Sequence, residues 1–121
     1  ISMQELTLSG SLRFRKGGVD VGMQYSGQKV DVSGSNYIHN VQSIGTTQEA
    51  LLLGDVATPG YGMFRNLDST NPVEIRPTTS GSDTIRLKAG EYAGPFRLEA
   101  TAPYAIATAA AVRLEYLIIE A

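Results

Sequence analysis

The stretch that decides the fold is NLDSTNPVEI, Asn66–Ile75, together with LKAGEYAGPFRL, Leu87–Leu98. In both, apolar residues alternate with polar ones on either side of a group rich in Asn, Asp, Ser, Pro or Gly. The alternation is typical of strands, and the groups between them favour tight turns. Both stretches therefore predict a strand, a turn and a second strand. Asp68 and Asn71 are expected to cap the first turn, and Gly90 to supply a positive φ in the second.

The same alternation runs through the N-terminal third of the chain. Every second residue from Leu6 to Phe14 is apolar or Gly, and the residues between them are polar. Lys16–Gly18 predicts a turn, after which the alternation resumes from Val19 to Tyr25. Ser26–Gln28 predicts a second turn before a third strand that carries Val30 and Val32. Residues 6–32 are therefore predicted to form an antiparallel meander.

Two later segments leave alternatives open. Thr46 and Glu49 have the spacing of a helix capping box, but so few residues precede Gly54 that a loop leading into a short strand is favoured. Residues 101–121 fit a helical and a strand period equally well. The β-branched and aromatic residues from Val112 to Ile119 favour a strand, and apolar residues on both of its faces favour a central position.

The number and spacing of these segments predict the fold class. Roughly eight to ten short strands with short connections indicate antiparallel neighbours rather than crossover helices. The sequence therefore predicts an all-β protein, an antiparallel two-sheet β-sandwich with a jelly-roll-like arrangement, in one domain over residues 1–121.

The composition limits the kinds of partner that the chain is expected to bind. Ten basic and twelve acidic residues give a formal net charge of -2, without blocks of one sign, and the pI is near 5.3. A nucleic-acid partner is therefore not expected. No apolar run of about eighteen residues predicts a membrane span, and the N-terminus lacks the pattern of a signal peptide. Because the chain has no Cys, disulfides and thiolate metal sites are not expected.

The side chains that most enzymes use are scarce. His39 is the single histidine, and no G-x-S-x-G or phosphate-loop motif accompanies it. A pair of carboxylates from distant strands would suffice for a glycosidase. The acidic residues nevertheless fall on the solvent-facing phase of strands or beside Arg, so surface ion pairs are the simpler interpretation; they are Glu74, Glu99, Glu115 and Glu120. We expect no catalytic residues, no metal and no cofactor.

Exposed tyrosines offer an alternative, since β-sandwich modules commonly bind sugars by stacking them on aromatic rings. The candidates for a carbohydrate-binding surface are Tyr25, Tyr37, Tyr61, Tyr92 and Tyr104. A Tyr near the end of a strand is more often a packing residue with a solvated hydroxyl.

The order of the motifs resembles small bacteriophage virion proteins. The resemblance lies in an alternating Ser- and Gly-containing start, SIGTTQEALLLGDV at 43–56, GYGMFRNLDSTNPVEI at 60–75, LKAGE at 87–91 and LEYLIIE at 114–120. It implies a non-enzymatic capsid decoration or cement protein located in the virion and assembled in the host cytoplasm. A tail, fibre or head-tail accessory protein is the alternative.

The resemblance also implies partners. Such proteins act as symmetric oligomers, so a homotrimer bound to the major capsid protein is expected. Strands near either end of the chain can pair with a neighbour, and the candidate interface residues are Leu6, Leu8, Leu12, Phe14, Leu114, Tyr116 and Ile118. The competing interpretation places these residues in ordinary core strands.

Overall fold

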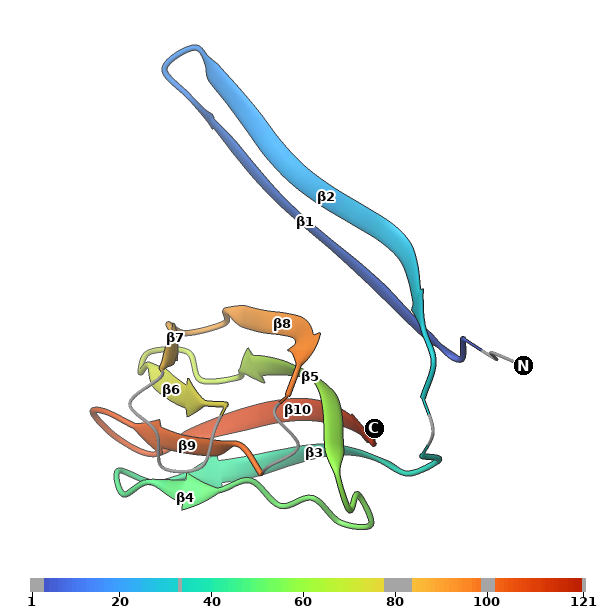
Figure 1. The fold of residues 1–121 in the computed structure, drawn as a ribbon. Coiled ribbons are helices and arrows are strands. Elements are labelled where there is room, and N and C mark those ends of the chain that lie inside the picture. Colours follow the sequence, from blue (N-terminus) through green and yellow to red (C-terminus); the bar gives the residue numbers. More distant parts are fainter. Residues whose placement is uncertain (1–3, 33, 78–83, 99–101, 121) are drawn as a thin grey trace. The chain divides into compact units, whose positions relative to one another are not determined.

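The computed structural model describes residues 4–32, 34–77, 84–98 and 102–120, and this part of the chain contains ten strands and no helix. The strands are β1 (Leu6–Lys16), β2 (Val19–Val30), β3 (Tyr37–Ile44), β4 (Glu49–Ala50), β5 (Pro59–Asn66), β6 (Val73–Arg76), β7 (Ile85–Leu87), β8 (Tyr92–Arg97), β9 (Tyr104–Ala107) and β10 (Val112–Glu120). They form one two-stranded and two four-stranded sheets, and every paired strand runs antiparallel to its neighbour (Figure 1). The prediction of an all-β, antiparallel protein is confirmed.

The chain divides into two compact units, Ile1–Ser33 and Gly34–Ala121, where the sequence predicted one domain over residues 1–121. Within the described residues, β1 and β2 pair only with each other. The main cluster of buried apolar side chains draws all its members from the second unit. The alternation of apolar and polar residues along β1 and β2 therefore identified an apolar face, but the side chains of this face are not members of the main buried cluster.

The first unit is a long β-hairpin in which β1 and β2 are joined by Gly17 and Gly18, both at positive φ. The turn predicted at Ser26–Gln28 is wrong, as is the third strand after it. Instead β2 continues to Val30, and its register shifts opposite Ser9, where Gly27 has a φ of 68°. A glycine at positive φ serves a β-bulge as well as it serves a turn, so the strand bends without reversing.

The second unit contains the two four-stranded sheets, with strand orders β3-β10-β5-β8 and β4-β9-β6-β7. The C-terminal segment is strand, as favoured, and β10 lies between β3 and β5 in its sheet. The loop and short strand favoured at residues 43–54 are also confirmed. Glu49 starts β4, and its carboxylate accepts a hydrogen bond from the Gly45 backbone at 3.2 Å instead of capping a helix.

Both four-stranded sheets contribute to one core. On β10 every second side chain from Val112 to Ile118 is buried, as the period of a strand requires. The other sheet contributes Val73 and Ile75 from β6 and Ala105 and Ala107 from β9, all of them buried. Burial of apolar surface from both sheets is the main stabilising contribution to this unit.

Asn66 joins the two stretches with which the sequence analysis began. It is completely buried at the end of β5, and its amide nitrogen donates to the carbonyl oxygens of Asn71 at 2.9 Å and Leu87 at 3.2 Å. Its side-chain oxygen accepts from the Asp68 backbone at 2.9 Å. One amide therefore holds the turn before β6 against the end of β7.

The turn roles predicted for Asp68 and Gly90 are confirmed. The Asp68 carboxylate accepts hydrogen bonds from the backbones of Thr70 at 2.9 Å and Asn71 at 2.6 Å, and these bonds lower the pKa of Asp68. Asn71 takes part through its backbone N–H and carbonyl. Gly90 has a φ of 79°, and Glu91 closes the second turn by donating to the Lys88 carbonyl at 3.1 Å.

Candidate interaction surfaces

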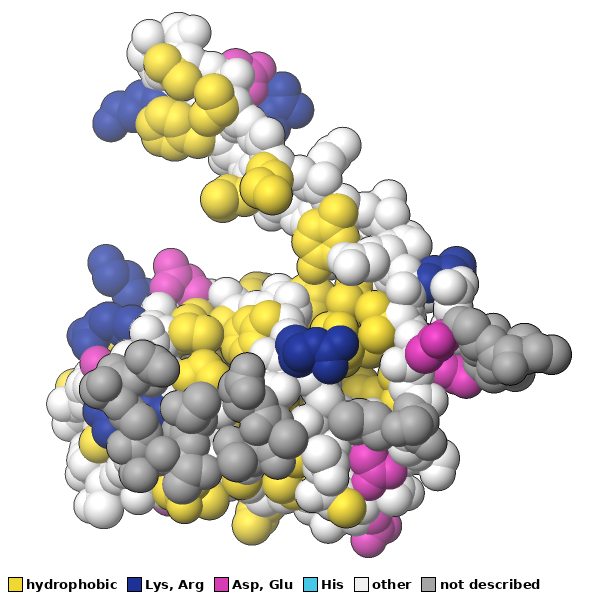
Figure 2. All heavy atoms as spheres, in the orientation of Figure 1, with side chains coloured by type: hydrophobic (Ala, Val, Ile, Leu, Met, Phe, Trp, Pro, Cys, Tyr) yellow, Lys and Arg dark blue, Asp and Glu magenta, His cyan; other side chains and the backbone are white. Residues whose placement is uncertain are grey.

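The hairpin is amphipathic. Residues in register on an antiparallel pair lie on the same face, so the pairings place the apolar side chains of both strands together. We call this the apolar hairpin face, and its registered pairs are Leu6–Val30, Leu8–Gln28, Gly10–Tyr25, Leu12–Met23 and Phe14–Val21, followed by Lys16–Val19 at the tip. Figure 2 shows apolar side chains, in yellow, along the hairpin.

The middle of this face is open to solvent. Leu12 is 78 % exposed and its partner Met23 is 81 % exposed, while Phe14 and Val21 are each more than half exposed. Single exposed apolar residues are normal, but a contiguous apolar patch marks an interaction surface. A two-stranded hairpin alone is also marginally stable in water. The apolar hairpin face is therefore a candidate interaction surface.

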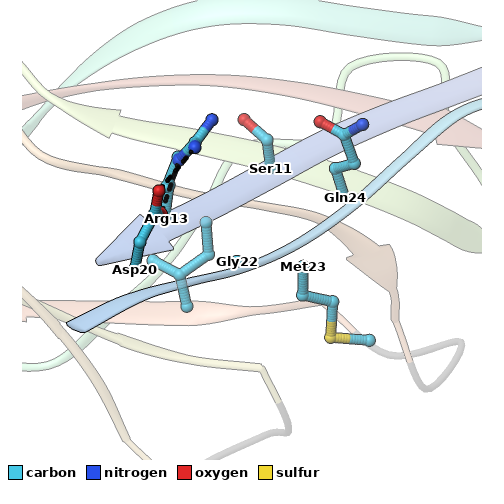
Figure 3. A pocket seen from close by; sticks show the side chains of 7 residues that line it. Ser11, Arg13, Asp20, Gly22, Met23 and Gln24 are labelled. Atoms are coloured by element: carbon cyan, nitrogen blue, oxygen red, sulfur yellow. Dashed lines mark hydrogen bonds and ion pairs between the residues drawn. The ribbon is translucent and has the colours of Figure 1, made fainter. Parts of the chain in front are cut away.

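The opposite hairpin face is polar. It carries Ser11 in register with Gln24, and Arg15 in register with Asp20. In Figure 3, Ser11 and Gln24 point to one side of the ribbon and Met23 points to the other. Arg13 contacts Asp20 at 3.0 Å on the polar side, and Arg15 lies 3.5 Å from the same carboxylate. These exposed pairs stabilise the hairpin only slightly, but they balance its charge locally.

Gly10 lies beneath the ring of Tyr25. A Cβ atom at Gly10 would lie 2.8 Å from Cε1 of Tyr25, so the ring occupies the space that a side chain would fill. Aromatic cover of a strand glycine across a registered pair stabilises the pairing. Tyr25 therefore has a packing role in the hairpin, and its ring is not free to stack against a sugar on that side.

The predicted interface residues fall into two groups. Leu12 and Phe14 are exposed on the hairpin, Leu6 is half-buried and Leu8 is buried. The other three are completely or almost completely buried in the core of the second unit: Leu114, Tyr116 and Ile118. These three hold the second unit together and offer no surface to a partner.

The hairpin surface also contains residues that sequence reasoning did not select for the interface, namely Val19, Val21, Met23 and Tyr25. Their alternation was recognised, but it was assigned to the second strand of a three-stranded meander. The available signal was the arrangement of the two strands: both flank a Gly-Gly turn, so their apolar residues pair on one side.

A second exposed surface lies on the sheet β3-β10-β5-β8, on the side away from the core. We call it the outer sheet face. Tyr37, Val41, Met63 and Tyr92 are its exposed apolar or aromatic residues. Registered neighbours complete it with His39, Tyr61, Arg65, Arg97, Arg113, Glu115, Leu117 and Ile119.

Two arginines on the outer sheet face stack on tyrosines. The Arg65 guanidinium lies 4.9 Å from the centre of the Tyr92 ring, and that of Arg97 lies 4.7 Å from the Tyr61 ring. Arg97 also donates to the Tyr61 hydroxyl at 2.7 Å. Cation–π contacts of this kind hold both side chains in place. Three of the five candidate sugar-binding tyrosines, Tyr37 included, therefore share this face, but two of them have one ring side covered by Arg.

His39 is part of the same face and pairs with a carboxylate. Its Nε2 lies 2.8 Å from Oε2 of Glu115, and more than half of the His39 side chain is exposed. Both residues border a shallow hollow of about 230 Å³, which Met63 and Leu117 help to line. This arrangement is a solvated cross-strand pair.

The other acidic residues also have structural partners. Glu74 is in register with Arg86 and contacts it at 3.1 Å, and Arg76 lies 3.6 Å away. Glu99 lies outside the described residues. In the part of the chain that the structure describes, no three His, Cys, Asp or Glu side chains are grouped as a metal site would require.

Glu120 ties the end of β10 to two other segments. Its carboxylate accepts from the backbones of Ala57 at 2.9 Å and Ser35 at 3.3 Å, and from the Asn36 amide at 3.5 Å. The hydrogen bond from Ala57 is the main cause of a pKa for Glu120 below its ordinary value of 4.5.

This carboxylate predicts a specific pH dependence. Because its pKa is lower in the folded state, its stabilisation is present at neutral pH and is lost as the pH falls through the folded-state pKa. The variant Glu120→Gln should therefore melt below the wild type at pH 7, and the difference should shrink steadily in acid. Thermal melts from pH 7 to pH 3 measure it, with Asp55→Asn, at an exposed position between β4 and β5 of the same unit, as the control. A constant difference across this range would contradict the assignment.

Comparison of the chain with protein-family models, curated proteins and solved structures found no match.

Among the described residues, no helix has the length and apolarity needed to cross a membrane.

Proposed function

We propose that this chain is a non-enzymatic structural protein of a bacteriophage virion, a capsid decoration or cement protein. In this proposal the second unit is a two-sheet, jelly-roll-like β-sandwich. The protein binds the outer surface of the capsid lattice as an oligomer, a homotrimer by the resemblance in its sequence, and stabilises the lattice. Its partners are other copies of itself and the major capsid protein.

The observation that carries this proposal is the apolar hairpin face. A hairpin whose apolar residues stay outside the main core suits a protein that works only in an assembly. The outer sheet face supports it independently, because Tyr, Met and Arg are enriched at protein–protein interfaces. Two such surfaces on one chain permit contacts with more than one neighbour, and several modest contacts together give strong retention on a lattice.

Binding to assembled capsids tests the proposal. Purified protein should cosediment with capsids that lack it and raise their melting temperature, because a ligand that binds the assembled state stabilises it. The variant Arg97→Glu should weaken binding about tenfold or more if the outer sheet face meets the capsid, since it reverses a charge and removes a stacked guanidinium. Arg13→Glu on the polar hairpin face reverses a charge elsewhere and is the control. Binding to tails or fibres but not to capsids would select the alternative role.

Carbohydrate binding is the second candidate, favoured by the position of Tyr37, Tyr61 and Tyr92 on one sheet face. A glycan array should then show a preference that Tyr92→Ala removes and Tyr104→Ala, on the other sheet, retains. An empty array would eliminate this candidate.

A further inference from the structure

Most of the apolar hairpin face carries no charged side chain. From Leu6–Val30 to Phe14–Val21, no registered pair on the apolar hairpin face includes a charged side chain. Lys16, in register with Val19 at the tip, is the charged residue at the end of this face. On the polar face, Arg13 and Arg15 share Asp20. Charges across an interface steer the encounter and exclude wrong partners, and most of this face has none to offer. A face without charge is matched best by another uncharged face, and the same chain in a second copy provides one.

The size of the face supports the same occupant. With on the order of 100 Å² exposed on each of six apolar side chains, the face offers roughly 600 Å² per copy, against about 800 Å² for a standard interface. These side chains are Leu12, Phe14, Val19, Val21, Met23 and Tyr25. Packing of hairpins from neighbouring copies therefore supplies most of the area that a stable association needs.

We propose that the apolar hairpin face is the surface through which copies of this chain associate, so that each hairpin is covered by hairpins of its neighbours around a rotation axis. The inference rests on the proposed function for the expectation of an oligomer. It adds the extent of the contact. Leu12 and Phe14 of the predicted interface are kept together with the exposed residues of β2. The buried residues Leu114, Tyr116 and Ile118 are left out. Hairpins that all turn this face toward one rotation axis form a closed oligomer.

The test is the mass of the full chain in solution, measured by light scattering over a dilution series. The double variant Leu12→Glu with Met23→Glu places like charges at the most exposed registered pair and should weaken association about a hundredfold or more. The matched control is Ser11→Glu with Gln24→Glu, which adds the same charges at the next registered pair on the polar face. It should keep the wild-type mass. A monomeric wild type, or equal masses for the two double variants, would overturn the inference.

A second measurement does not depend on disruptive substitutions. The chain has no Cys, so a single introduced thiol is the only one present. A short bis-maleimide should join copies that carry Met23→Cys and leave copies that carry Gln24→Cys largely unjoined. Equal cross-linking at the two positions would contradict the proposed face. An oligomer that depends on Leu12 and Met23 but binds no capsid would retain this inference and remove the proposed function.

Discussion

The variant Asn66→Asp is expected to lower the free energy of unfolding of the second unit by about 4 kcal/mol, although its side chain has almost the same shape. Asn66 is completely buried, and its amide nitrogen donates to two carbonyl oxygens. Asp replaces this donor by an oxygen, so a buried charge faces two acceptors. Each buried polar group left without its partner costs about 1–3 kcal/mol, and a charge costs more.

Urea unfolding at pH 7 measures this loss. Asn71→Asp is the matched control, because Asn71 is only half-buried and contacts Asn66 through its backbone carbonyl. The difference between Asn66→Asp and the wild type should narrow in acid, where a protonated carboxyl can again donate one hydrogen bond. Equal effects at the two positions would show that Asn66 is not the residue that joins the two turns.

The variant Phe64→Ala should destabilise the second unit by about 3–5 kcal/mol. Phe64 is 1 % exposed in the middle of β5, and its ring stacks on Phe96 with a distance of 5.7 Å between ring centres. Truncation removes the Phe64 ring and leaves a cavity beside Phe96 that the surrounding backbone cannot readily fill. The measurement is again urea unfolding, followed by circular dichroism.

Met63→Ala is the control, because Met63 precedes Phe64 on the same strand but is 39 % exposed on the outer sheet face. Its cost should stay within about 1 kcal/mol. Comparable losses at positions 63 and 64 would mean that the two faces of β5 are not divided into a buried and an exposed side.

The sequence predicted those strands and turns that depend on local residue patterns, such as the alternation of apolar and polar residues. Val112–Ile119 was correctly favoured as a strand because β-branched and aromatic residues are dense there, and Asp68 was correctly expected to cap its turn. The turn predicted at Ser26–Gln28 failed because a glycine at positive φ is common to turns and bulges. Only the register with the opposite strand distinguishes them, and register is a tertiary property.

The two surfaces were harder to predict. A period of two indicates that Leu12 and Met23 lie on an apolar face, but it does not indicate what covers that face. Leu114 and Tyr116 show the same period and are buried. Asn66 raises a similar difficulty, since an Asn close to Asp68 and Ser69 is typical of a solvated turn. In the structure it is completely buried and donates a hydrogen bond to the Leu87 carbonyl at the end of β7.

The position of β10 between β3 and β5 has a consequence for biosynthesis. The sheet β3-β10-β5-β8 cannot be completed until β10, the last of its strands to be synthesised, has left the ribosome. The hairpin needs only a Gly-Gly turn, and local pairing of this kind forms in about 1–10 μs. The strands of the hairpin can therefore pair while the second unit is still being translated, and its apolar face precedes the completed sheet in time.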